Sequence, residues 1–261
     1  MGGIFAFLFA VLIGFFALLL LGLGKILWKK IRIVSIISFV FSGICFLPII
    51  FFIFIISFNV IEQHKFKNDY IKENGKLFAE IVYGNTKSIY KEVIKSNNLN
   101  IVDKNGETPL YRVSGRDFSY FQIIKKMIEK GADPNIARED GKIPLHAASQ
   151  ASQNIEEIKF LVDNGSNINK QDNDGYTPLM LCIEHSKYTG EKALQTVNFL
   201  ISKGCDTKLK NKRNENSIEI IMRLIKEEED AYKEYPNLNY KESKSYILYE
   251  KLLEILKASN S

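Results

Sequence analysis

The sequence lacks the residue patterns that mark most enzymes and metal sites. Its three cysteines are dispersed, without the spacing of metal ligands. Its three histidines, His64, His146 and His185, have no nucleophile or metal-ligating partner at a recognisable distance along the chain. A nucleophile elbow, a phosphate loop and a dinucleotide fingerprint are also missing. The sequence therefore predicts no catalysis, no cofactor, no metal and no small-molecule substrate.

Acidic residues are missing from residues 1–58, whose only charges are Lys25, Lys29, Lys30 and Arg32. Subtracting these four from the formal net charge of +5 leaves +1 for residues 59–261. The excess positive charge thus comes mostly from one short loop. Because nucleic acid is recognised by an extended basic surface, no nucleic-acid partner is expected.

Two long uncharged runs flank that basic loop. Residues 4–23 are apolar over about 20 positions, enough to span a bilayer as a helix. Residues 33–58 form the second run, with Pro48 as a point where a helix can kink. A cleaved signal peptide does not fit, because no basic residue precedes the first run. The pattern predicts two transmembrane helices and therefore a lipid bilayer as one partner.

Small residues recur along one face of each predicted membrane helix. They follow a three- or four-residue step: Ala6, Ala10 and Gly14 in the first helix, and Ser35, Ser38 and Ser42 in the second. Small residues let helices approach closely in lipid. We expect the two faces to pack together as a hairpin, with dimerisation between two chains as the alternative.

The basic loop at 24–32 also sets the expected orientation. The positive-inside rule keeps such a loop in the cytoplasm, so both ends of the chain would face away from it. In a bacterial inner membrane, residues 59–261 would then be periplasmic. Lys65, Lys67, Lys72 and Lys76 follow the second run and argue the other way. A cytoplasmic orientation therefore stays open.

The remaining chain repeats one phrase at a fixed period. It reads Asp-Lys-Asn-Gly-Glu-Thr-Pro-Leu at 103–110, Glu-Asp-Gly-Lys-Ile-Pro-Leu at 139–145 and Asp-Asn-Asp-Gly-Tyr-Thr-Pro-Leu at 172–179. The turn glycines Gly106, Gly141 and Gly175 are spaced 35 and then 34 residues apart. A second phrase, Gly-Ala-Asp-Pro-Asn at 131–135, recurs in altered form at 165–169 and 204–206. This period and these phrases resemble the ankyrin repeat.

The resemblance covers about 75–258 and implies an all-α fold. We expect a two-helix transmembrane hairpin over 1–58, a linker over 59–74, and an ankyrin-repeat α-solenoid with short β-hairpin tips over 75–261. About five repeats are expected, with degenerate caps at the ends. His146 matches the motif histidine, which usually hydrogen-bonds adjacent repeats. Longer segments near 187–191 and 229–243 are insertions, either binding loops or neutral growth.

Ankyrin arrays bind other proteins through their hairpin tips and through the exposed ends of the first helices. When this sequence is aligned with the ankyrin repeat, the positions at the tips are Lys104, Glu107, Arg138, Lys142, Asn173, Tyr176, Lys210, Lys212 and Arg213. The helix positions are Arg116, Gln150, Glu184 and His185. The resemblance implies a partner-binding surface made of these residues.

These features predict a non-enzymatic protein-interaction module anchored in a membrane. An exported, anchored binder fits an immunity-type protein that neutralises a toxin, by analogy alone. The alternative is a regulatory subunit of a membrane protein complex, in which the transmembrane hairpin itself makes the key contacts.

Overall fold

The computed structural model describes residues 55–58, 60–63, 65–72, 75–152, 154–233 and 239–260. It divides the chain into two compact units, Met1–His64 and Lys65–Ser261. The predicted membrane helices lie outside the described residues except at 55–58, and so do their small residues Ala6, Ala10, Gly14, Ser35, Ser38 and Ser42. Within the described residues, no helix is both long and apolar enough to cross a bilayer. The transmembrane hairpin stays a prediction.

Part of the predicted linker at 59–74 is helical and belongs to the second unit. Residues 65–72 form a helix that packs on the first helix of the repeats. Lys67 Nζ lies 2.7 Å from Glu80 Oε1, and the Tyr70 ring meets the Tyr83 ring edge-on at 5.8 Å. These contacts join residues 65–72 to the repeat array.

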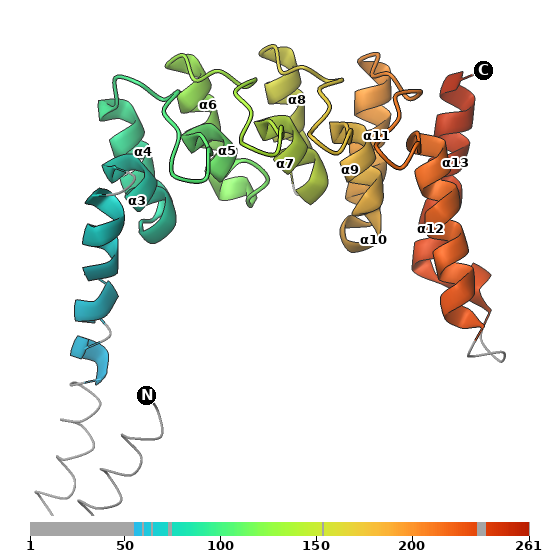
Figure 1. The fold of residues 1–261 in the computed structure, drawn as a ribbon, viewed down its shortest axis with the longest axis horizontal. Helices are drawn as coiled ribbons and strands as arrows, with labels where there is room; N and C mark the ends of the chain where they lie inside the picture. The colour runs from blue at the N-terminus through green and yellow to red at the C-terminus, as the bar shows by residue number, and fades with distance from the viewer. Residues whose placement is uncertain are drawn as a thin grey trace, which may run out of the picture. The chain divides into compact units, whose positions relative to one another are not determined.

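After the helix at 65–72, the described part of the second unit contains five successive helix pairs (Figure 1). The first helices of the pairs are α3 (Lys76–Tyr83), α5 (Pro109–Val113), α7 (Pro144–Ala151), α9 (Pro178–Glu184) and α12 (Ser217–Tyr232). The second helices are α4 (Thr86–Lys95), α6 (Phe121–Glu129), α8 (Ile155–Asp163), α11 (Glu191–Ser202) and α13 (Lys244–Asn260). Three short helices lie in the connections: η1 (Phe118–Tyr120), α10 (Ser186–Thr189) and η2 (Tyr240–Glu242).

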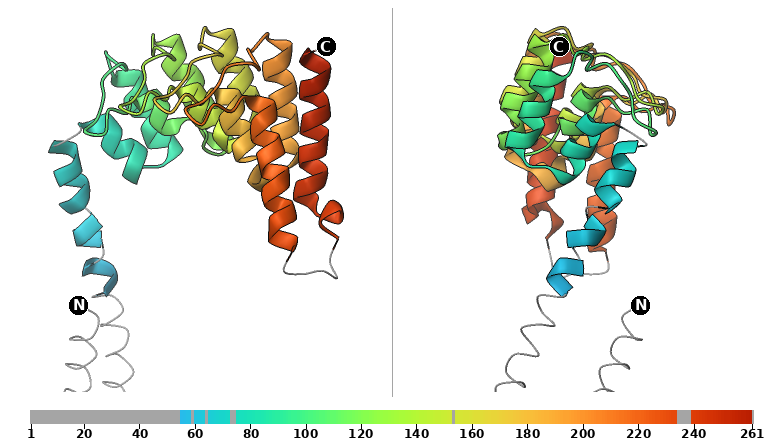
Figure 2. Two further views of the ribbon diagram at one scale, coloured as in Figure 1. Left: turned by 45° about the vertical axis from the view of Figure 1, so that its right-hand side comes forward. Right: turned by 90° about the vertical axis from the view of Figure 1, so that its left-hand side faces the viewer.

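The pairs stack into two layers. Each first helix contacts the first helix of the next pair, and the second helices contact one another in the same order. The loops that join one pair to the next extend together from one side of the layers (Figure 2). The predicted all-α solenoid is confirmed. The expected β-hairpin tips are turns, because no strand occurs in the described residues and each tip closes with few backbone hydrogen bonds.

Threonine and proline start two of the first helices. The Thr108 hydroxyl accepts the Tyr111 N–H at 3.1 Å, and the Thr177 hydroxyl accepts the Met180 N–H at 3.3 Å. In both helices the next residue is a proline, which fits the first turn because that turn leaves its N–H groups unpaired. The local sequence therefore sets where these helices begin.

In the third pair, Ile143 has no side-chain acceptor to cap α7, and His146 instead binds the backbone N–H of Ile143. Its Nδ1 accepts the Ile143 N–H at 3.1 Å, so Nε2 carries the hydrogen and donates to the Tyr176 carbonyl at 3.1 Å. Burial lowers the pKa of His146, which keeps the imidazole neutral in this arrangement. The bond to Tyr176 crosses to the next pair, and it confirms the role predicted for the motif histidine.

The hydrophobic core runs without a break between the two layers. Its fully buried members include Ile89, Val113, Ile124, Leu145, Ile158, Leu161, Val197, Leu200, Ile220 and Leu252. Cys182 belongs to this core, and burial raises the pKa of its thiol to about 12. Cys205 is half-buried, and burial raises its pKa to about 11. Both are free thiols, as expected for small packed residues.

The two predicted insertions are more helical than expected. Residues 187–191 contribute to α10 and to a turn at Gly190, where φ is 59°. In the second insertion, α12 continues to Tyr232 and η2 follows at Tyr240–Glu242, so 229–243 is not simply a loop. The Ser243 hydroxyl donates to Glu228 at 2.7 Å and holds the end of this segment against α12. Helix α10, which lies between the two helices of the fourth pair, contacts α13 of the last pair.

Candidate partner-binding face

Four turns, which we call the tips, start the second to fifth pairs. They cover residues 103–107, 138–142, 172–176 and 211–215, and in each the first N–H donates to the last carbonyl. Neighbouring tips are joined by backbone bonds, from Asn173 N to Asp140 O at 2.8 Å and from Lys212 N to Asp174 O at 2.9 Å. The last three tips therefore form one continuous ridge.

Close backbone contact between tips explains their glycines. Gly141 has a φ of +83°, and a Cβ there would lie 2.8 Å from the backbone nitrogen of Asn173. Glycine is thus required both for the turn conformation and for the approach of the next tip. In the last tip the equivalent residue is Asn214, with a φ of 60°, a conformation that asparagine tolerates.

A hollow of about 440 Å³ lies between the first two tips, with Lys104, Glu107 and Arg138 among its lining residues. Arg138 forms ion pairs with Glu107 at 2.8 Å and with Asp140 at 2.8 Å. Its guanidinium also lies over the Tyr111 ring, 5.4 Å from the centroid. These three contacts hold a partly exposed cation in one orientation at the surface.

The charges of these tips stabilise one another. Partial burial opposes ionisation of Asp140, but the Lys142 N–H and the nearby Arg138 charge outweigh it and lower the pKa of the carboxyl. Lys142 Nζ lies 3.4 Å from Asp140 and 3.9 Å from the buried Asp172. The predicted tip residue Lys142 is therefore engaged within the array.

Polar residues of the first helices form a second group. Gln150 of α7 contacts His185 Nε2 at 3.1 Å, and His185 Nδ1 lies 3.1 Å from the Leu181 carbonyl. Glu184 pairs with Arg223 of α12 at 2.7 Å. Since Arg223 also binds two further carboxylates, it is a hub of this group. The predicted residues Gln150, Glu184 and His185 thus meet along α7, α9 and α12.

Other predicted residues have separate positions. Arg116 donates to the Arg112 carbonyl at 3.0 Å and lies over the Tyr120 ring at 5.0 Å, so it supports the loop after α5. The Asn173 amide donates to the Glu139 carbonyl at 2.8 Å and links two tips. The exposed basic residues of the last tip are Arg213 and Lys212, which pairs with Asp174 at 3.6 Å. The predicted residue Lys210 lies just before this tip and pairs with Glu219 at 3.3 Å. Among the described residues, no group of three or more His, Cys, Asp or Glu side chains could hold a metal ion.

Residues 116–211 match a family model for ankyrin repeats in three copies. This segment consists of ankyrin repeats. An ankyrin repeat-containing protein of Schizosaccharomyces pombe is 40% identical over 60 residues, which cover 23% of this chain and 28% of that protein. A putative ankyrin repeat protein of Rickettsia felis is 35% identical over 106 residues, covering 38% of this chain and 47% of that protein. The potassium channel AKT1 of Oryza sativa subsp. indica is 36% identical over 76 residues, covering 29% and 8%. The chain thus spans less than half the length of these relatives.

Three residues that position the tips and the polar group on the first helices were not among the predicted site residues. Arg112 supports the first tip, since its Nε lies 2.9 Å from Glu107, and Tyr111 supports the second tip, since the Arg138 guanidinium lies over its ring. Arg223 was missed because the fifth helix pair begins with Ser217-Ile218 in place of Thr-Pro, which obscures the register of its first helix. The charge pattern offered one signal, because Arg223 stands alone among apolar residues of α12.

Proposed function

We propose that this chain is a non-enzymatic protein-interaction module whose ankyrin repeats bind a protein partner through the tips and the polar group on the first helices. The observation that carries the proposal is the hollow at Arg138. There a guanidinium is held over Tyr111 by Glu107 and Asp140 and stays about one-third exposed. Arginine and tyrosine are the residue types that most often dominate binding energy.

Pre-orientation is the physical reason for this choice. A long side chain loses conformational entropy when a partner immobilises it, and that loss weakens binding. Arg138 has lost much of this freedom before any partner arrives. A partner carboxylate could therefore bind Arg138 at a smaller entropic cost than an exposed surface lysine such as Lys208.

Site-specific photocrosslinking in the native host tests this proposal. A photoreactive phenylalanine analogue replaces Lys104 or Asn173 at the tips, and Glu156, exposed on the second helix α8, as the matched control. We expect the two tip positions to yield an adduct with one protein of the same mass, and Glu156 to yield none. Adducts from Glu156 alone would place binding on the opposite layer and contradict the proposal.

The proposal includes membrane anchoring by residues 1–58, with the repeats on the periplasmic side of a bacterial inner membrane. Support comes from the two uncharged runs and from the four basic residues between them. Fusions of alkaline phosphatase or a cytosol-dependent fluorescent protein after Ser261 test it. Phosphatase activity without fluorescence is the expected outcome, and fluorescence without phosphatase activity would reverse the orientation.

An anchor exchange separates the immunity-type role from the membrane-complex alternative. If residues 1–58 only tether the repeats, an unrelated two-helix anchor restores protection against the toxin or other function. If residues 1–58 make key contacts, the unrelated anchor does not restore function, and the double variant Ala10→Leu, Ser42→Leu loses function as well. The second outcome would favour a regulatory subunit over an anchored binder.

A further inference from the structure

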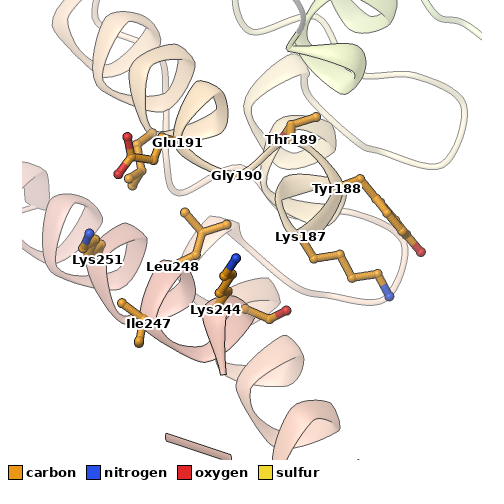
Figure 3. Close-up of a pocket in the computed structure, with 11 residues that line it drawn as sticks. Lys187, Tyr188, Thr189, Gly190, Glu191, Lys244, Ile247, Leu248 and Lys251 are labelled. Atoms are coloured by element: carbon orange, nitrogen blue, oxygen red, sulfur yellow. The ribbon is translucent and has the colours of Figure 1, made fainter. Parts of the chain in front are cut away.

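A groove lies at the last repeats of the array, where the first insertion, 187–191, meets the start of α13 (Figure 3). It has a volume of about 440 Å³ and lies between α10, the start of α11 and α13. Its residues come from two segments that are 50 positions apart in the sequence, 187–194 and 244–251. None of them belongs to the tips or to the hollow at Arg138, so the groove is a separate surface.

The floor of the groove is apolar. It is formed by Leu194 of α11 with Ile247 and Leu248 of α13. Leu248 projects toward the turn at Gly190 and is buried, whereas Ile247 is 44% exposed (Figure 3). Tyr188, 75% exposed, stands at one side of the groove. Apolar side chains exposed together around a hollow are the usual mark of a binding site.

The rim of the groove is basic. Lys187, Lys244 and Lys251 line it, and none of the three has an ion-pair partner within the part of the chain that the structure describes. Lys187 Nζ instead lies over the Tyr188 ring at 4.9 Å. One acidic residue, Glu191, also lines the groove. The surplus of positive charge contrasts with the tips, where most of the charges are paired.

We propose that this groove binds an acidic segment of a partner protein, with one apolar side chain of that segment on the floor at Ile247. Carboxylates of the segment would pair with Lys244 and Lys251 at the rim. A protein segment fits better than an anionic membrane surface, because a flat bilayer does not fill a hollow. The inference goes beyond the proposed function, since it adds a second surface with its own ligand chemistry.

A direct binding experiment tests the groove on the full-length chain purified in a nonionic detergent. The probe is a fluorescein-labelled peptide, Glu-Asp-Glu-Leu-Phe-Glu-Asp, followed by fluorescence anisotropy. Lys244→Glu combined with Lys251→Glu is expected to weaken binding about tenfold, because two attractions become repulsions. Ile247→Ser removes the exposed floor residue and should weaken it by a similar factor. Lys257→Glu, on the same helix but outside the groove, is the matched control and should bind as the wild type does.

Several results would overturn the inference. They are absence of binding to the wild type, equal affinity for all variants, or equal affinity for a peptide with Ser-Ser in place of Leu-Phe. Binding of phosphatidylserine vesicles without binding of the peptide would assign the surface to lipid. Self-association that the double variant abolishes would assign it to a second copy of the chain. Circular dichroism confirms that each variant is folded, and unchanged crosslinking from Lys104 separates failure at the groove from failure at the tips.

Discussion

A buried carboxyl between two repeats makes stability depend on pH. Glu157 of α8 is 2% exposed, and its Oε1 accepts the Gly115 N–H at 2.9 Å. Gly115 follows α5 and has a φ of +75°, and a Cβ there would lie 2.6 Å from the Ala147 carbonyl oxygen. Burial raises the pKa of Glu157 from 4.5 to about 7, because the described residues provide no cation beside it. The carboxyl thus ties the third helix pair to the loop of the second, and folding favours its neutral form.

The size of the effect follows from the two pKa values. A difference of about 2.5 units corresponds to about 3 kcal/mol at about 1.4 kcal/mol per unit. For an acid with a raised pKa in the folded state, stability is highest below pH 4.5, where both states are protonated. The stability falls as the pH rises from 4.5, and the full penalty is present above about 7. Glu157→Gln keeps a neutral acceptor for the Gly115 N–H and should abolish this dependence.

Urea unfolding followed by circular dichroism, at a series of pH values from 4.5 to above 7, measures the effect. The two proteins should have similar stability at the acid end, and the Gln variant should be more stable by up to about 3 kcal/mol at the alkaline end. Glu157→Ala is the control, since it also lacks the titrating carboxyl but leaves the Gly115 N–H without its partner, so it should be less stable than the Gln variant at every pH. A difference between wild type and Gln variant that does not change with pH would refute the assigned protonation.

Three further predictions concern the array itself. Gly141→Ala should lower the free energy of unfolding by about 1–3 kcal/mol, because it adds strain at positive φ and a clash with the next tip. Asn214→Gly at the equivalent turn should change the stability little, and thermal unfolding compares the two variants. Arg223→Ala should cost about 1–3 kcal/mol in urea unfolding, since it leaves three carboxylates without their shared cation, and high salt should reduce the loss. The lowered pKa of His146 means that stability is full above its ordinary pKa of 6.5 and is lost as the pH falls below it. The double variant His146→Ala, Glu157→Gln should not lose stability in this way at acid pH, whereas Glu157→Gln alone should. Urea unfolding of the two variants at a series of pH values compares them.

Local signals in the sequence predicted the repeat architecture well. The first helices α5, α7 and α9 begin at Pro109, Pro144 and Pro178, where the repeated phrase places them. Helix starts are predictable because capping and the fit of proline depend on neighbours a few residues away. The extension of α12 to Tyr232 was not predicted. Residues 226–233 are mostly charged and resemble a solvated loop, but the helix there packs on α13, a contact between segments apart in sequence.

The candidate site was predictable in position but not in its pairings. The repeat register placed Glu107 and Arg138 at tips, and the structure shows them 2.8 Å apart in one hollow. Their contact joins residues 31 positions apart, and the pair between Glu184 and Arg223 joins residues 39 apart. The two residues of each contact are about one repeat apart in the sequence, so the stacking of neighbouring repeats brings their side chains together. A single sequence gives the period but not the side-chain rotamers that decide which charges meet.

The pairing of charges has a consequence for recognition. Along the first helices and the tips most charged side chains already have partners within the array, so a binding protein must either match that fixed pattern or displace it. Specificity would then depend on shape and on a few oriented groups such as Arg138. The groove between 187–194 and 244–251 differs, because its three lysines are unpaired among the described residues and Ile247 on its floor is exposed. If one partner contacts both surfaces, the two contacts act within one complex and the affinity exceeds that of either alone. Variants at Arg138 and at Lys244 with Lys251 should then weaken binding of that partner by more together than either change does alone.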